Sequence, residues 1–168
     1  MEKKAGHEDL HLVQFVDLTE DRMEAVLQLF RDGGWDAGSL FSVRHEMRAC
    51  VRGDIPGYIR PHFILAVVKD QVIGAAAWAA SPCSFNMYEL SWATVAPAWR
   101  HQGINALMLQ KRLEQVRELH GPGPLDVLVC TWVNAMYART GFVPLLPPGE
   151  FHDEKSTERI LLKAHFEK

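Results

Sequence analysis

The chain has 168 residues, a formal net charge of -3, 48% hydrophobic residues and 23% charged residues. This length can build one well-buried core but not two, so we expect a single domain over residues 1–168. The small acidic excess argues against a broad nucleic-acid surface, and no apolar run is long enough to predict a membrane span. A charged N-terminus without an apolar signal region favours a cytoplasmic protein.

The cysteine and histidine positions predict neither a disulfide framework nor a metal site. Cys50, Cys83 and Cys130 are an odd number and lack Cys-x-x-Cys spacing, which favours reduced thiols. His7 and His11 stand four residues apart, but His7 lies in a charged tail and His11 in an expected strand. Helical ligand geometry is therefore not expected for this pair.

The first third of the chain predicts a strand and two helices. Residues 10–16 read as a strand, after which Thr19 can cap a helix. The apolar residues of this helix have helical spacing: Met23, Val26, Leu27 and Phe30. A glycine-rich break follows at residues 33–38, and Ser39 can cap a second helix that ends before Gly53. Its expected core positions are Val43, Met47, Cys50 and Val51.

The middle of the chain predicts three strands. Two apolar runs, residues 62–69 and 71–80, are joined at Lys69-Asp70 and have the spacing of a hairpin. A third strand covers residues 87–95, where Pro97 ends the possible ladder pairing.

The last third predicts two helices and two more strands. A helix begins near Gln102 and ends at Gly121-Pro122, followed by a strand at residues 125–131, a short helix at Tyr137 and a last strand at residues 158–165. The proline-rich residues 144–149 read as a shaped loop that could wall a pocket. The βααβββαβαβ order predicts an α/β (mixed α+β) fold with a mostly antiparallel sheet and helices on both faces.

Residues 95–107 are the most informative motif, because a strand runs there into a tight turn that opens a helix. The free amides and the positive dipole end of a helix N-terminus can hold an anionic group, and Arg100 adds a charge beside them. The same pattern also occurs in ordinary strand-to-helix connections with a surface arginine. A second motif, Tyr137-Ala138-Arg139-Thr140-Gly141-Phe142, follows the strand at residues 125–131.

Together the two motifs resemble the GNAT superfamily of acyl-CoA-dependent N-acetyltransferases. The resemblance lies in a Val-x-Pro strand end, an Arg-x-x-Gly loop and a Tyr-x-Arg-x-Gly-Phe helix end, in that order. In two places the chain departs from the family pattern: Asn105 replaces a third small residue of the loop, and Asn134 lies unusually close to Tyr137.

The resemblance implies acetyl-CoA (coenzyme A) as the cosubstrate. It implies that main-chain groups of Ala93 and Val95 pair with the pantetheine arm, and that Arg100 adds charge at the pyrophosphate. The amides that would hold the pyrophosphate belong to Gln102, Gly103, Ile104, Asn105 and Ala106. Asn134 is a further expected coenzyme A contact.

Glu89 and Tyr137 are the catalytic candidates that the resemblance implies. A carboxylate whose pKa is raised by partial burial can take the proton of an attacking amine, and a phenol can donate a proton to the departing thiolate. The alternatives are that Glu89 is a satisfied polar residue of a strand and that Tyr137 only packs against Phe142.

Several aromatic residues are candidates for the acceptor pocket: Trp35, Phe41, Phe85, Tyr88, Trp92 and Phe151. We expect Trp78 and Trp132 to be packing residues. Cys130 lacks a partnering His or Asp at a recognisable spacing, so direct transfer is preferred over an acyl-cysteine intermediate.

The resulting hypothesis is an N-acetyltransferase that moves an acetyl group from acetyl-CoA to a primary amine by direct attack in a ternary complex. The alternative is a non-catalytic acyl-CoA-binding or sensing module. A small-molecule or peptide amine is the expected partner, with no nucleic acid, no membrane and no metal. The sequence leaves open the acceptor and the oligomeric state, a homodimer included.

Overall fold

A computed structural model describes residues 7–53, 59–82, 84–131, 133–145 and 160–167. Its sheet has the strand order β1-β2-β3-β4-β5-β7-β6. The strands are β1 (Gln14–Asp17), β2 (His62–Val68), β3 (Gln71–Ala80), β4 (Met87–Val95), β5 (Leu125–Thr131), β6 (Val143–Pro144) and β7 (Ile160–Phe166). Among these, β4 and β5 are parallel and the other neighbours are antiparallel, which confirms the predicted mixed sheet.

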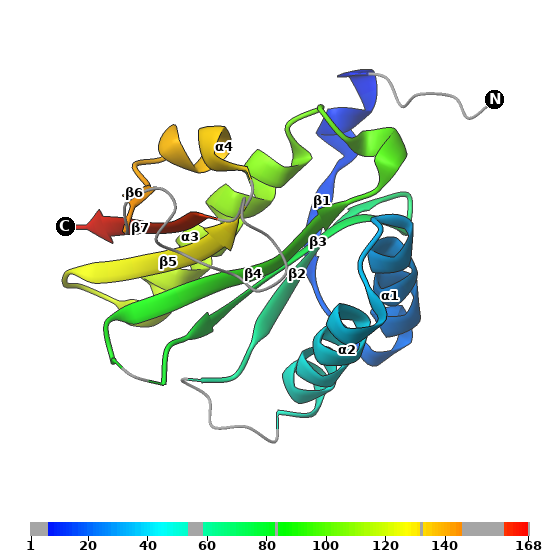
Figure 1. Ribbon diagram of the computed structural model, residues 1–168. Helices are drawn as coiled ribbons and strands as arrows, with labels where there is room; N and C mark the ends of the chain where they lie inside the picture. The colour runs from blue at the N-terminus through cyan, green and yellow to red at the C-terminus, as the bar shows by residue number, and fades with distance from the viewer. Residues whose placement is uncertain (1–6, 54–58, 83, 132, 146–159, 168) are drawn as a thin grey trace.

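The helices form a layer on each face of the sheet (Figure 1). Helices α1 (Met23–Asp32) and α2 (Ala37–Arg52) cover β2, β3 and the end of β4, where Phe30 and Met47 are fully buried. Helices α3 (Ile104–His120) and α4 (Asn134–Ala138) cover the opposite face. There Leu109 and Tyr137 share a second cluster with the inward side chains of β5 and β7.

Local sequence chemistry explains the confirmed turns. Lys69 and Asp70 have φ values of 48° and 64°, the left-handed pair that a two-residue hairpin between twisted strands requires. Gly53 ends α2 at φ 67°, and its N–H donates to the Ala49 carbonyl. The carboxylate of Asp36, not Ser39, caps α2, since it accepts the Ser39 N–H at 2.8 Å.

The structure corrects several predicted boundaries. Residues 10–12 lie in a 3-10 helix (His7–Leu12), and the strand β1 starts only at Gln14. Thr19 makes no side-chain cap bond and precedes a short 3-10 helix (Glu20–Arg22) that leads into α1. Helix α3 begins two residues after Gln102, because Gly103 adopts φ 85° at its N-cap.

At the C-terminal end, Pro144, the first residue of the expected loop, instead forms a short edge strand with Val143 against β7. The rest of the expected proline-rich loop and the start of the expected last strand at residues 158–159 lie outside the described residues. Among the described helices, none combines the length and the apolar character that crossing a bilayer requires.

Candidate active site

The parallel strands β4 and β5 separate halfway along their length. Their pairing covers four residues on each strand and ends with Leu90 opposite Val129. Strand β4 continues to Val95, which still pairs with Gly74 of β3 on its other side. Beyond Leu90, the β5-facing edge of β4 therefore has no partner strand among the described residues, and we call this opening the splay.

A β-bulge in β4 lies at the splay. Ala77 pairs with Ser91 and Ala75 with Thr94, so that Trp92 and Ala93 both lie opposite Ala76. Trp92 has φ 51°, a left-handed conformation that is costly for an aromatic residue. An extra residue bends a strand and increases its local twist, which explains why β4 leaves β5 at this point.

Arg112 of α3 holds this bulge from the opposite face of the sheet. Its side chain is fully buried, and Nη1 donates to the Ala77 carbonyl at 3.2 Å and to the Ser91 carbonyl at 3.5 Å. A buried guanidinium costs free energy where it lacks hydrogen bonds, and Nε and Nη2 of Arg112 have no partner among the described residues. The arginine therefore connects α3 to the two strands that define the splay, a role that the sequence analysis did not assign.

The N-terminus of α3 lies at the end of β4. A 3-10 turn (Pro97–Trp99) leads to Gly103, and the first helical bond of α3 runs from the Leu107 N–H to the Gly103 carbonyl at 3.0 Å. Within the described residues, the amides from Gly103 to Ala106 donate to no protein acceptor. A Cβ built on Gly103 would meet no atom within 4 Å, so the turn is open to solvent at Gly103.

The side chains around this turn differ in part from the expectation. The Arg100 Nε atom donates to the Val95 carbonyl at 3.1 Å, so the guanidinium folds back onto β4 and occupies one of the expected arm-binding groups. Gln102 bonds to the Ala98 carbonyl through Nε2 at 3.2 Å. The Asn105 Oδ1 atom is buried and accepts no hydrogen bond from the described residues.

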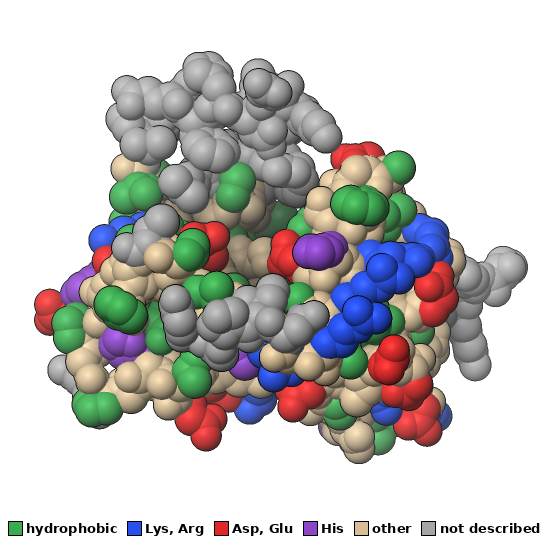
Figure 2. Space-filling model, turned by 90° about the horizontal axis from the view of Figure 1, so that it is seen from below, with side chains coloured by type: hydrophobic (Ala, Val, Ile, Leu, Met, Phe, Trp, Pro, Cys, Tyr) green, Lys and Arg blue, Asp and Glu red, His purple; other side chains and the backbone are tan. Residues whose placement is uncertain are grey.

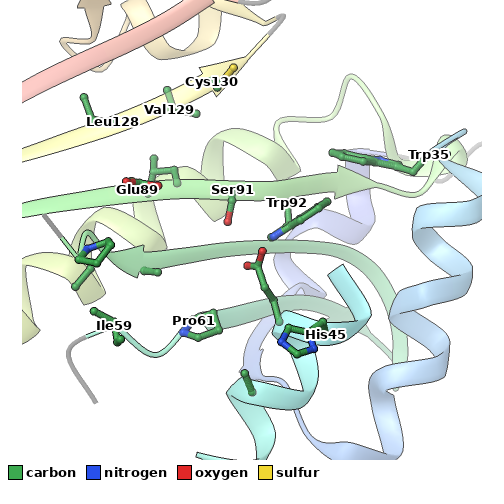
Figure 3. Close-up of a pocket in the computed structure, with 16 residues that line it drawn as sticks. Trp35, His45, Ile59, Pro61, Glu89, Ser91, Trp92, Leu128, Val129 and Cys130 are labelled. Carbon is green, nitrogen blue, oxygen red and sulfur yellow. The ribbon is translucent and has the colours of Figure 1, made fainter. Parts of the chain in front are cut away.

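A cavity of about 700 Å³ opens on the α1 and α2 side of the splay, and we call it the splay pocket. Figure 3 shows Glu89, Ser91 and Trp92 entering it from β4 and His45 from α2, with the end of β5 above them. Figure 2 shows a hollow with acidic and hydrophobic side chains around it, while Lys and Arg side chains gather to one side. The described lining residues are Trp35, His45, Glu46, Ala49, Ile59, Pro61, Ala79, Ala80, Pro82, Glu89, Leu90, Ser91, Trp92, Leu128, Val129 and Cys130.

Glu89 lies where the splay and its pocket meet. It pairs with Ala79 on β3 and with Leu128 on β5, one residue before the last parallel pair. Its side chain is exposed, so the partial burial that we expected is not found. The carboxylate is instead accessible to a molecule that enters the pocket.

Glu46 is a second carboxylate of this pocket that sequence reasoning missed. Burial raises its pKa, the Trp92 indole and His45 oppose that rise, and the Glu89 charge adds to it. The Trp92 N–H faces Glu46 without forming a hydrogen bond of ordinary geometry. The sequence signal was available, because Glu46 directly precedes the buried Met47 and follows Val43 by three residues on the apolar side of α2.

Tyr137 lies on the opposite face of the sheet from the splay pocket. Its side chain is 3% exposed, and its ring packs edge-on against Phe142 with centroids 5.3 Å apart. This contact is the packing that the sequence analysis gave as the alternative, although it leaves the role of the hydroxyl open. Asn134 is the first residue of α4, and its side chain lies outside what the structure describes.

The expected aromatic residues divide into two groups. Trp35 and Trp92 line the splay pocket with ring centroids 5.6 Å apart, whereas Tyr88 is buried in the core. Phe41 and Phe85 are exposed and are not among the lining residues. Trp78 packs in the core as predicted, while Phe151 and Trp132 lie outside the described residues.

Cys130 is exposed and lines the pocket at the end of β5. Cys50 is buried, and Cys83 lies outside the described residues. In the described part of the chain, no three His, Cys, Asp or Glu side chains come together as metal ligands would.

The comparisons with known proteins point to one fold. The chain is similar to a Desulfovibrio desulfuricans protein assigned to the GNAT acetyltransferases, with a TM-score of 0.73, 18% identity and 92% and 98% of the two chains covered. It is similar to the PaiA N-acetyltransferase of Thermoplasma acidophilum, solved in complex with coenzyme A, with a TM-score of 0.65, 12% identity and 92% and 99% coverage. No protein-family model and no curated protein matches the sequence.

A third similar structure is the ribosomal-protein-S18-alanine N-acetyltransferase of Escherichia coli, with a TM-score of 0.67, 12% identity and 93% and 95% of the two chains covered. Because the similar chains are covered almost completely, the similarity extends over the whole architecture. The chain therefore has the GNAT fold, as the two sequence motifs predicted.

Proposed function

We propose that this protein transfers an acetyl group from acetyl-CoA to a primary amine by direct attack in a ternary complex. One observation carries the proposal: the edge of β4 that lacks a partner strand ends at the amides that begin α3, which donate to no acceptor among the described residues. A ligand with an anionic group and a long amide-bearing arm can use both features at once, since helix amides bind phosphate oxygens and a free strand edge pairs with an extended chain.

The cosubstrate is held mainly by main-chain groups in this proposal. The amides of Gln102, Gly103, Ile104, Asn105 and Ala106 face the pyrophosphate, and Arg100 adds a positive charge beside them. Ala93 and Val95 supply strand-edge groups for the pantetheine arm. Since Arg100 bonds to the Val95 carbonyl, the arm either displaces this contact or pairs at Ala93.

The chemistry occurs where the splay opens into the pocket. An ammonium group cannot attack, so Glu89 first takes its proton, and the neutral nitrogen then forms a bond to the acetyl carbon. The carbon–sulfur bond breaks, and the thiolate receives a proton from Tyr137 or a water molecule. The acylated nitrogen loses its remaining extra proton, which restores this donor, so that the amide, the thiol and the protonated Glu89 carboxyl are left. The accessible position of Glu89 at the splay supports its role as the base. For Tyr137 to act as the acid, its buried hydroxyl must reach this point from the opposite face of the sheet.

The test is thioester turnover with a panel of primary amines. We expect Glu89→Gln to lower kcat by about 100-fold or more, the usual contribution of a general base, while acetyl-CoA affinity is kept. Glu118→Gln makes the same change outside the splay pocket and serves as the control, with an unchanged rate. Tyr137→Phe tests the acid, and a full rate for this variant would remove Tyr137 from the mechanism.

Calorimetry with acetyl-CoA separates the transferase from a non-catalytic acyl-CoA-binding module. Tight binding together with transfer to no amine would support the module and contradict the transferase. A protein that binds no acetyl-CoA would contradict both.

A further inference from the structure

The splay pocket carries two carboxylates on different walls. Glu89 belongs to β4 and Glu46 to α2, and both line the cavity. They lie close enough for the charge of Glu89 to act on Glu46. Two acidic groups exceed what proton removal from one amine requires, so Glu46 is left without a role in the chemistry.

No Lys or Arg within the described lining offsets these carboxylates. Neither Lys nor Arg is among the described residues of the pocket wall, and neither glutamate forms an ion pair with a described Lys or Arg. His45 is the other ionisable neighbour that acts on Glu46, and it is exposed. A partly buried carboxylate without a cationic partner is unfavourable, and a cationic ligand relieves that cost.

The rest of the wall suits the carbon chain of such a ligand. Trp35 and Trp92 contribute two indole rings with centroids 5.6 Å apart. Ala49, Ile59 and Leu128 provide apolar surface, and the cavity volume of about 700 Å³ exceeds what one small amine fills. The pocket therefore combines anionic, aromatic and aliphatic surface.

We propose that the acceptor is an aliphatic amine with a second cationic group, of the linear diamine type. Its reacting nitrogen lies at Glu89 beside the splay, and its distal ammonium lies at Glu46. This inference rests on the proposed acetyl transfer and adds the substrate class. Glu46 acts as a specificity-determining residue, since it contacts the end of the acceptor that does not react.

The experiment compares putrescine with pentylamine, which has the same number of heavy atoms and one charge fewer. Initial rates with saturating acetyl-CoA give kcat/KM for each amine. We expect the wild type to prefer putrescine by about 10-fold or more, the worth of one charge-assisted contact. We expect Glu46→Gln to bring the ratio close to unity, mainly through a higher KM for putrescine.

Two further variants make the result specific to Glu46. Glu46→Asp keeps the charge and is expected to retain part of the preference, which a purely structural role would not explain. Glu118→Gln removes an exposed carboxylate outside the pocket and is expected to leave the ratio unchanged. Circular dichroism of each variant verifies that it is folded.

The outcomes separate this inference from the proposed function. Acetylation of both amines with equal kcat/KM by the wild type would overturn the diamine proposal and keep the transferase. A preference that survives Glu46→Gln would also overturn it. Transfer to no amine at all would contradict the transferase, and the diamine proposal with it.

Discussion

Phe30 supports the aromatic wall of the splay pocket from behind, so its replacement tests how the core positions the site. Its side chain is fully buried and is not part of the described pocket lining. The ring contacts Trp35 edge-on with centroids 5.2 Å apart and Trp92 edge-on with centroids 6.3 Å apart. We therefore consider Phe30→Leu, which keeps the apolar character but removes both ring contacts.

The expected cost follows from these contacts. Each edge-to-face pair contributes about 0.5–1.5 kcal/mol beyond its buried area. The space that the smaller leucine leaves unfilled adds about 1 kcal/mol. The sum is a loss of about 2–4 kcal/mol of unfolding free energy, or a decrease in Tm of about 5–15 °C for a chain of this length.

Urea unfolding and amine kinetics measure the two effects of Phe30→Leu. We expect a higher KM for the amine, because Trp35 and Trp92 lose their support, and an unchanged Kd for acetyl-CoA. Phe41→Leu makes the same change at a position that is 76% exposed, and its expected effect is within about 0.5 kcal/mol. Equal unfolding free energies for the two variants would refute the reasoning.

Two further predictions concern stability. Asp36→Ala removes the carboxylate that caps α2 and is expected to cost about 1 kcal/mol of unfolding free energy. Thr19→Ala removes no cap bond and should cost less than about 0.5 kcal/mol. Thermal unfolding compares the two variants, and equal losses would contradict the cap assignment. Burial raises the Glu46 pKa above its ordinary value of 4.5, so the Glu46 carboxyl stays protonated to a higher pH in the folded protein than in the unfolded chain. The stability of the wild type relative to Glu46→Gln should therefore fall as the pH rises from 4.5 through the folded pKa. Denaturant unfolding of both proteins across this pH range measures the difference, and parallel stability profiles would show that the pKa of Glu46 is not shifted by folding.

Much of the fold could be predicted because it depends on short-range patterns. The bounds of β3, β4 and β5 follow from apolar runs that end at turn residues or at proline, and the Lys69-Asp70 turn follows from the hairpin spacing. The cap of α2 was misplaced because Asp36 and Ser39 are both good N-cap residues. Only the backbone angles decide between them, and Asp36 has the extended conformation of a cap.

The pocket was less predictable, because it depends on contacts between distant segments. Glu46 and Glu89 are 43 positions apart in the sequence, and only the packing of α2 beside β4 brings them to one cavity. Arg112 follows Met108 by one helical turn on the buried side of α3, but no sequence pattern shows that it reaches the bulge carbonyls. The splay itself arises where pairing between β4 and β5 stops, which periodicity does not predict.

The central claim is that the amides at the start of α3 hold the diphosphate of coenzyme A. A ¹⁵N-resolved NMR titration of the folded protein with acetyl-CoA tests it most directly, because it reports on each amide separately. We expect the resonances of Gly103, Ile104, Asn105 and Ala106 to shift most, together with those along the edge of β4 that lacks a partner strand. Saturable binding that leaves these four amides unchanged would contradict it.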